Sequence, residues 1–332
     1  MIEQEIYGEY VEHRVIESPK REEKKKTRHL TKRASEVIFI IAMLLFPIIQ
    51  FVIFWVIPNF NSIIMGFQDS YGGFTMNNFK RFFDFITEKD FLGNYNELVY
   101  AIRNSVIYFA VNIFISTPIV IFFSYVLFKR VPLSNVFRVV FYLPSIIGAT
   151  VTTTLYRTLL LEGAPAYELL KMMGFITEEM ELLGLFANDS TAFLMVIIYS
   201  IWTCVGINMI MFYGAMKRIP NEIFESAEID GVGFFRQFIS IVVPLIWPTI
   251  TTLIIFSLSS MFISYGAVMI LCPDVKTASM VGWYIVRWTT ATDSHASLNY
   301  PAAVGLIFTA IGLPFVLVVR WLLNKVSANV EY

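Results

Sequence analysis

Charge is scarce in this chain and nearly absent from its apolar stretches. Only 15% of the 332 residues are Asp, Glu, Lys or Arg, whereas 56% are hydrophobic and 16% are aromatic. A soluble domain usually has about 25% charged residues, so the composition places the chain in a lipid bilayer. The formal net charge of -1 provides no attraction for nucleic acid or for an acidic partner, and we expect no nucleic-acid binding.

Cysteine and histidine are also few. Cys204 lies inside an apolar stretch, Cys272 follows another, and the three histidines are scattered among polar segments. This spacing contains neither a disulfide framework nor the ligand cluster that a zinc site requires. We therefore expect no metal site and no cofactor in this chain.

Nucleotide-binding and hydrolytic motifs are missing as well. The sequence contains no GxxxxGK[ST] phosphate loop, no HExxH and no GxSxG. Its apolar stretches hold almost none of the ionisable groups that proton- or ion-coupled carriers usually keep within the membrane. The chain is therefore not expected to be an enzyme, and any transport that it performs needs energy from a separate protein.

Six apolar stretches approach or exceed the roughly 20 residues that a spanning helix needs. They cover residues 37–57, 106–128, 139–156, 192–215, 249–270 and 302–323. Several threonines interrupt the third stretch, but threonine can hydrogen-bond back to its own helix. The sequence predicts an all-α, polytopic membrane protein with six transmembrane helices, in which residues 34–332 form the membrane domain and residues 1–33 a basic tail.

Lysine and arginine are distributed unevenly between the polar segments. Nine, three, three and two of the 25 basic residues fall in segments 1–36, 129–138, 216–237 and 320–332. Only four, two and two fall in segments 58–104, 157–191 and 272–300. The positive-inside rule then predicts that both termini are cytosolic. The tail can serve as an orientation signal without ordered structure, or it can bind anionic lipid or a partner.

The polar segment between the fourth and fifth stretches, residues 219–244, has a distinctive pattern. Pro220 suits the first turn of a helix, where its missing N–H is no loss. Three glutamates follow at intervals of three, near the positive end of the helix dipole. Asp230-Gly231 then ends this helix, and a second helix can begin before Phe234.

These residues predict a helix–turn–helix that protrudes into the cytosol with an acidic stripe and an apolar side. The apolar side consists of Ile223, Phe224 and Ala227. A soluble partner can receive such an elbow in a groove. An ordinary acidic helix start followed by a re-entry loop gives the same pattern, so the residue types alone leave both interpretations open.

The segment resembles the EAA loop of binding-protein-dependent ABC importer permeases, whose pattern is roughly IP-x3-yEAA-x2-DGA-x6-F-x2-I-x2-P. The matching residues of this chain are Ile219-Pro220, Glu225-Ser226-Ala227, Asp230-Gly231, Phe238, Ile241 and Pro244. Ser226 and Val232 replace two alanines of the pattern.

Other segments resemble the maltose-type carbohydrate branch of these permeases. They are Phe46-Pro47, Met65-Gly66-Phe67-Gln68-Asp69, Asn77-Asn78-Phe79, Arg103-Asn104-Ser105, Phe141-Tyr142-Leu143-Pro144 and Asn299-Tyr300-Pro301-Ala302-Ala303-Val304-Gly305. The glycine-rich turn that this branch has after the fifth span is replaced here by Leu271-Cys272-Pro273-Asp274.

The resemblance implies a type I ABC importer permease fold in a cytoplasmic membrane of bacterial type, and a set of partners. These are a second permease, usually a different chain that makes a heterodimer, two ATPase subunits that bind ATP and Mg, and an extracytoplasmic binding protein that delivers carbohydrate. It also implies that the loop docks into an ATPase subunit. Glu225 is then the main polar anchor, Phe224 and Ala227 make the apolar contact, and Gly231 is the point of closest backbone approach. Asp230, beside Gly231, belongs to the same set of coupling residues.

A sugar path through the membrane needs hydroxyl, amide and aromatic groups, because pyranose rings offer hydroxyls and apolar faces. In the fifth stretch, one stripe with spacings of three and four consists of Ser257, Ser260, Met261, Ser264 and Tyr265. Thr203, Ile207 and Asn208 occupy a similar depth in the fourth. We expect these residues to line a cavity between the third, fourth and fifth spans. Helix–helix packing, in which small hydroxyl residues let backbones approach, would produce the same pattern.

Two alternatives stay open. The same machinery can carry a non-sugar solute such as an amino acid, a peptide or glycerol phosphate. A phosphate would favour a basic residue along the path, and the third to fifth stretches contain none. The other alternative is a polytopic membrane protein without transport activity, because the apolar composition by itself shows only that the chain lies in a membrane.

Overall fold

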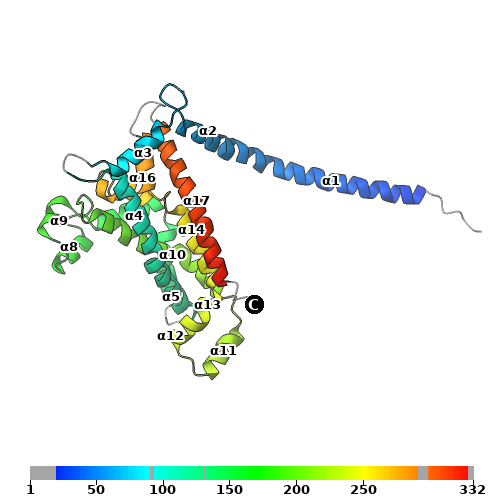
Figure 1. Cartoon of the computed structure of the whole chain (residues 1–332). Helices are drawn as coiled ribbons and strands as arrows, with labels where there is room; N and C mark the ends of the chain where they lie inside the picture. The colour runs from blue at the N-terminus through cyan, green and yellow to red at the C-terminus, as the bar shows by residue number, and fades with distance from the viewer. Residues whose placement is uncertain (1–19, 90–92, 130–131, 133, 291–297, 328–332) are drawn as a thin grey trace, which may run out of the picture. The chain divides into compact units, whose positions relative to one another are not determined.

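The structure is a computed structural model that describes residues 20–89, 93–129, 132, 134–290 and 298–327. Only the backbone is described for residues 20–33, 135, 207, 326 and 327. Nearly all regular structure in these ranges is helical, and the β pairing consists of two isolated bridges. The chain falls into two units, residues 1–62 and 63–332 (Figure 1).

The first unit is dominated by one long helix. The backbone is helical from Lys20, in α1 (Lys20–Phe51), η1 (Val52–Val56) and the start of α2 (Ile57–Gly66). From Ala34 to Gly66 this helix has 33 apolar-rich residues, enough to cross a bilayer, and its large apolar side chains are exposed. Residues 1–19 of the predicted tail lie outside the described residues. The backbone of residues 20–33 is helical, although one expectation was a tail without ordered structure.

Three π-helical turns in the described residues each end two residues before a proline. They are η1 before Pro58, η2 (Asn112–Ser116) before Pro118, and η3 (Phe238–Val242) before Pro244. A proline inside a helix cannot donate to the carbonyl four residues back, and its ring crowds that carbonyl. The widened turn, in which Thr117 N–H bonds to Asn112 O for example, relieves this crowding without ending the helix.

Three further helices of the second unit are long and apolar enough to cross a membrane. They are the continuous run of α4 (Glu97–Val111), η2 and α5 (Thr117–Phe128), then α10 (Ala192–Met216), and α17 (Asn299–Ser327). Two bent pairs add up to two more spans, so the described residues contain four to six candidate spans in total.

The first bent pair differs from the continuous span expected over residues 139–156. The chain bends by 105° between helix α6 (Ser134–Ile146) and helix α7 (Ala149–Leu159). Pro144 lies in the last turn of α6, and Gly148 takes an extended conformation at the start of α7. Thr152 Oγ1 lies 3.2–3.4 Å from three carbonyl oxygens at the bend, which provides a donor for groups that the break leaves without helical partners.

The second pair replaces the continuous span expected over residues 249–270. Helices α12 (Phe234–Gln237), η3 and α13 (Val243–Leu245) form one arm, which bends by 69° into α14 (Trp247–Ser260). Residues 261–265 then interrupt the helix before α15 (Gly266–Leu271). A Cβ on Gly282 would lie 2.5 Å from the Ile263 carbonyl oxygen, so a glycine there lets α16 (Val281–Thr290) lie against this interruption.

Short helices connect these spans. They are α3 (Asn77–Thr87), α8 (Pro165–Met172), α9 (Glu178–Leu183), α11 (Asn221–Ile229) and the 3₁₀ turn η4 (Lys276–Ala278). The apolar core has three parts: one joins α5, α10 and α11, one joins α7, α8, α10 and α15, and one joins α3, α4, α16 and α17. In Figure 1, α11 and α12 lie at one end of the second unit, and α3 and α16 at the other.

Candidate functional site

The segment 219–244 forms the helix–turn–helix that the sequence predicts, and this segment is called the elbow below. Helix α11 begins directly after Pro220 and ends in a Schellman motif, in which Val232 N–H bonds to Ala227 O at 2.9 Å and Gly231 N–H to Glu228 O at 3.1 Å. Gly231 has φ +69°, and a Cβ there would meet nothing within 4 Å. The positive φ is therefore what requires a glycine at this position within the chain.

The apolar side of α11 faces the chain's own core. Phe224 and Ala227 are buried, and the Phe224 ring packs 5.3 Å from that of Phe128 at the end of α5. Lys129 Nζ lies 5.0 Å from the Phe224 ring centre and 3.2 Å from Glu228 Oε1. These contacts fasten α11 to the second span. The expected contact of Phe224 and Ala227 with a partner does not fit this geometry, because the apolar stripe of a helix turns to the nearest core.

The surface that α11 leaves open is mainly acidic. The side chains of Glu222, Glu225, Ser226 and Asp230 are exposed, and Ile229 is 87% exposed. A partner that approaches the elbow therefore meets carboxylates around one large apolar side chain.

The second arm of the elbow is also held by the second span. Tyr125 of α5 is fully buried and donates from its hydroxyl to the buried side-chain oxygen of Gln237 at 3.1 Å. Its ring centre lies 4.7 Å from that of Phe234 and 5.2 Å from that of Phe238. Both arms of the elbow thus pack on α5, so a displacement of either arm acts on the same helix.

A cavity of about 530 Å³ lies between the spans, and a second one of about 250 Å³ adjoins it. The residues shared by their linings are Tyr108, Asn112, Cys204, Asn208 and Ser264. Of the predicted path, Thr203 and Tyr265 line the larger cavity, and Ser257, Ser260 and Met261 line the smaller. The structure therefore brings seven of the eight predicted residues together, while the side chain of Ile207 lies outside the described part.

The linings of both cavities, as far as the structure describes them, contain no Asp, Glu, Lys, Arg or His. They present hydroxyl, amide and aromatic groups instead. Several of these groups are already ordered: Thr153 Oγ1 lies 2.7 Å from the Tyr199 hydroxyl, and Asn112 Nδ2 donates to Tyr108 O at 2.9 Å. Such a lining suits a neutral, hydroxyl-rich ligand, because its groups both donate and accept hydrogen bonds.

Sequence reasoning missed the contribution of the second span to this lining. Tyr108 and Asn112 come from α4 and η2, whereas only the third, fourth and fifth spans were expected there. An amide in an otherwise apolar stretch was the available signal. The bend between α6 and α7 also brings in Ser145 and Thr150.

Gly206 of α10 allows α6 to approach the cavity closely. A Cβ on this glycine would lie 2.6 Å from Ser145 Oγ and 2.7 Å from the Phe141 carbonyl oxygen. The backbone contact cannot give way easily, so only glycine permits this packing. The position of α6 beside the cavity thus depends on one residue without a side chain.

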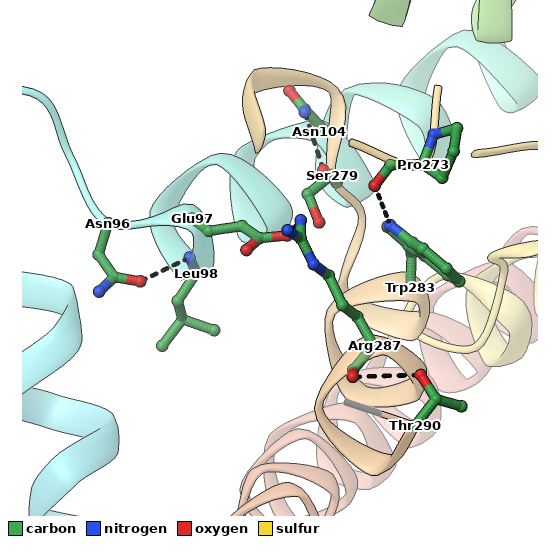
Figure 2. Close-up of polar contacts among 9 residues, drawn as sticks. All are labelled: Asn96, Glu97, Leu98, Asn104, Pro273, Ser279, Trp283, Arg287 and Thr290. Carbon is green, nitrogen blue, oxygen red and sulfur yellow. Dashed lines mark hydrogen bonds and ion pairs between the residues drawn. The ribbon is translucent and has the colours of Figure 1, made fainter. Parts of the chain in front are cut away.

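The end of the unit opposite the elbow is tied together across a long sequence separation. Asn104 of α4 is fully buried and donates to Thr277 O at 2.7 Å and to Ser279 O at 2.9 Å. Ser105 Oγ accepts from Val281 N–H at 3.0 Å. Figure 2 shows the hydrogen bond from Asn104 to the backbone oxygen of Ser279. It also shows Arg287 of α16 extending toward Glu97 at the start of α4. These bonds fix segment 277–281 against the second span.

The sequence from residue 98 to 331 matches the family described as binding-protein-dependent transport system inner membrane component. The chain is 28% identical over 281 residues to a probable ABC transporter permease protein, YurN, of Bacillus subtilis, covering 80% of this chain and 91% of that protein. It is 21% identical to the arabinooligosaccharides transport system permease protein AraP of the same organism, covering 85% and 86%.

Solved structures show the same fold. The chain resembles a chain of a bacterial ABC transporter involved in the import of the acidic polysaccharide alginate, with a TM-score of 0.75, 21% identity, and coverage of 90% of this chain and 99% of that one. The family match extends over more than two thirds of the sequence and includes both the elbow and the cavity-lining helices. The chain therefore belongs to the family of binding-protein-dependent transport system inner membrane components.

Proposed function

We propose that this chain is the permease subunit of an ABC importer that takes up a neutral oligosaccharide. The observation that carries the proposal is an uncharged cavity between the spans with hydroxyl and amide groups in its lining, together with an elbow fastened to one of the helices that line it. Relatives support the cargo class: AraP is named for arabinooligosaccharides and NgcF of Streptomyces coelicolor for diacetylchitobiose uptake, the latter 22% identical over 89% of this chain.

Neutral cargo follows from the cavity lining. A phosphate or uronate group that leaves water needs a cationic or strongly donating partner, since an unpaired buried charge is costly. The Arg157 guanidinium, at the end of α7, donates to the Ile270 carbonyl oxygen at 3.1 Å and does not line either cavity. Hydroxyl, amide and tyrosine groups instead match sugar hydroxyls and ring faces. Glycerol phosphate and acidic polysaccharides fit this lining less well.

The proposed topology has six spans and both termini in the cytosol. The bent pair of α6 and α7 forms the third span, and α14 with α15 forms the fifth. The uneven distribution of lysine and arginine supports this orientation. The elbow is then cytosolic, and the end that carries α3 and α16 faces the extracytoplasmic side. There, a solute-binding protein delivers the sugar.

In the assembled importer, a second permease subunit, usually a different chain, completes the path, and two ATPase subunits bind ATP and Mg. One ATPase subunit receives the open face of α11. Glu225 and Asp230 supply polar contacts, and Gly231 shapes the turn. Phe224, Ala227 and Tyr125 pass the displacement to the second span, since they join the elbow to α5. Movement of that span changes the cavity, because its residues Tyr108 and Asn112 line it.

The experiment that tests this coupling is Glu225→Lys in the assembled transporter. Reversal of an exposed charge at the docking surface should abolish uptake while membrane insertion stays normal. Glu179→Lys in α9, an exposed glutamate remote from the elbow in sequence, is the matched control and should transport normally. Uptake of a neutral oligosaccharide at the wild-type rate by the Glu225→Lys transporter would refute the docking role.

A further inference from the structure

A third cavity, of about 690 Å³, lies at the end of the unit opposite the elbow. Its walls come from the residues after α3, the start of α4, the loop before α10, η4 and α16. Its volume lies within the roughly 300–1,000 Å³ typical of small-molecule sites. Neither the coupling mechanism nor the central cavity uses these residues.

Aromatic rings and carboxylates share this lining. Tyr95 is half-exposed and Tyr100 is partly buried, and a cation lies near each ring: Lys89 Nζ at 4.6 Å from the Tyr95 centre, and the Arg103 guanidinium carbon at 5.2 Å from that of Tyr100. These contacts hold the rings in place and add to their stability. Aromatic faces of this kind suit the apolar faces of sugar rings.

The charged residues of the lining are mostly acidic. Four carboxylates, of Glu88, Glu97, Asp189 and Asp274, stand against the ammonium groups of Lys89 and Lys276. Carboxylates accept hydrogen bonds from sugar hydroxyls but repel uronate or phosphate groups. The lining therefore favours a neutral saccharide over a polyanion, as the central cavity does.

Segment 277–284 contributes to the linings of both this cavity and the central one. Thr277 and Tyr284 line the outer cavity, whereas Met280 between them lines the central one. The ion pair of Arg287 with Glu97 at 3.3 Å joins α16 to the start of α4, and Figure 2 shows Arg287 extending toward Glu97. Asn104 fixes the first part of this segment through its bonds to Thr277 and Ser279.

We propose that the outer cavity is a second saccharide site, which holds part of a neutral oligosaccharide before it reaches the central cavity. The site rests on the proposed function, because it lies on the delivery side only if the elbow is cytosolic. Tyr100 supplies a ring face, and Asp274 and Asp189 accept hydrogen bonds from hydroxyls. Asp189 already accepts from Thr277 Oγ1 at 2.6 Å, which positions its carboxylate.

The test measures uptake by the complete transporter in liposomes, with its binding protein, as a function of saccharide concentration. The probe is whichever of an arabino-, chito- or malto-oligosaccharide the wild-type transporter imports. Tyr100→Ala and Asp274→Asn should each raise KM about threefold or more and leave kcat unchanged, because they remove binding outside the transport step. Tyr100→Phe, which keeps the ring, should restore the wild-type KM.

Tyr71→Ala is the matched control, since Tyr71 is 98% exposed and does not line the cavity. Wild-type KM values for Tyr100→Ala and Asp274→Asn would overturn the proposal. So would weaker binding of the sugar-free binding protein to either variant, because the cavity would then be a protein contact. If the wild-type transporter imports none of the three oligosaccharides, the proposed function itself fails, which is a different result from a failure of the outer site.

Discussion

Replacement of Asn104 by alanine gives a quantitative test of how segment 277–281, which follows the fifth span, is held against α4. The Asn104 side chain is completely buried, and its amide donates two hydrogen bonds to segment 277–281, which is more than 170 residues distant in sequence. Alanine removes the donor and leaves two backbone carbonyls without this partner. The change therefore acts on tertiary structure and leaves helix α4 itself intact.

The expected size follows from the cost of an orphaned polar group. Each buried acceptor that loses its donor costs about 1–3 kcal/mol. One of the two acceptors, Thr277 O, is only partly buried, so water can replace some of its loss. We expect Asn104→Ala to lower the free energy of unfolding by about 2–4 kcal/mol. Ser105→Ala should cost about 1–3 kcal/mol, because Val281 N–H loses its buried acceptor.

The measurement is reversible unfolding of the purified chain in mixed micelles, followed by tryptophan fluorescence. Trypsin cleavage after the exposed Lys276 gives a local readout, and it should accelerate in Asn104→Ala if segment 277–281 detaches. Asn59→Ala is the control, since Asn59 makes an exposed bond within its own helix, to Trp55 O at 2.7 Å. Equal stability of the two variants, with unchanged cleavage, would refute the reasoning.

Two further predictions concern the elbow and the buried thiol. Gly231→Ala should lower the free energy of unfolding by about 1–2 kcal/mol, because alanine is strained at a φ of +69°, and Gly231→Asn should lower it less. If denaturation shows that Gly231→Ala is as stable as wild type, the left-handed turn at this position is contradicted. Burial raises the pKa of Cys272 to about 12, so the folded protein should keep this thiol protonated and unreactive toward a maleimide at pH 8, and the unfolded chain should react readily. In a Cys204→Ala background, rapid labelling of the folded protein at pH 8 would show that Cys272 is accessible.

Local sequence signals predicted the elbow well. Pro220 before a helix start and Asp230-Gly231 at its end specify a short helix and a left-handed turn, and both are present. The direction that α11 faces was not predicted. Phe224 and Ala227 share one stripe whether that stripe meets a partner or the chain's own α5, and only the packing against Phe128 decides between the two.

The predicted substrate path was likewise predicted in part from local sequence, and the rest of it depends on tertiary packing. A serine stripe and two polar residues of the fourth stretch line the cavities. Spacing placed the serine stripe on one face of its helix, whereas Thr203 and Asn208 were predicted from their depth in the membrane. Tyr108 and Asn112 were missed because no local pattern shows which helix will lie opposite. The bends at residues 147–148 and 246 were missed as well, because a proline in a membrane helix can be absorbed by a π turn or can end the helix.

The sequence by itself determined the apolar stretches, the scarcity of charge within them and the start and end of the elbow, because these depend on composition and on residues within a few positions of one another. The tertiary structure decided which faces are covered, where the spans bend and which polar groups meet across the cavities. Contacts such as that of Asn104 with Ser279, or of Gly206 with the Phe141 carbonyl, depend on helices that are distant in sequence and leave no periodic signal in the chain.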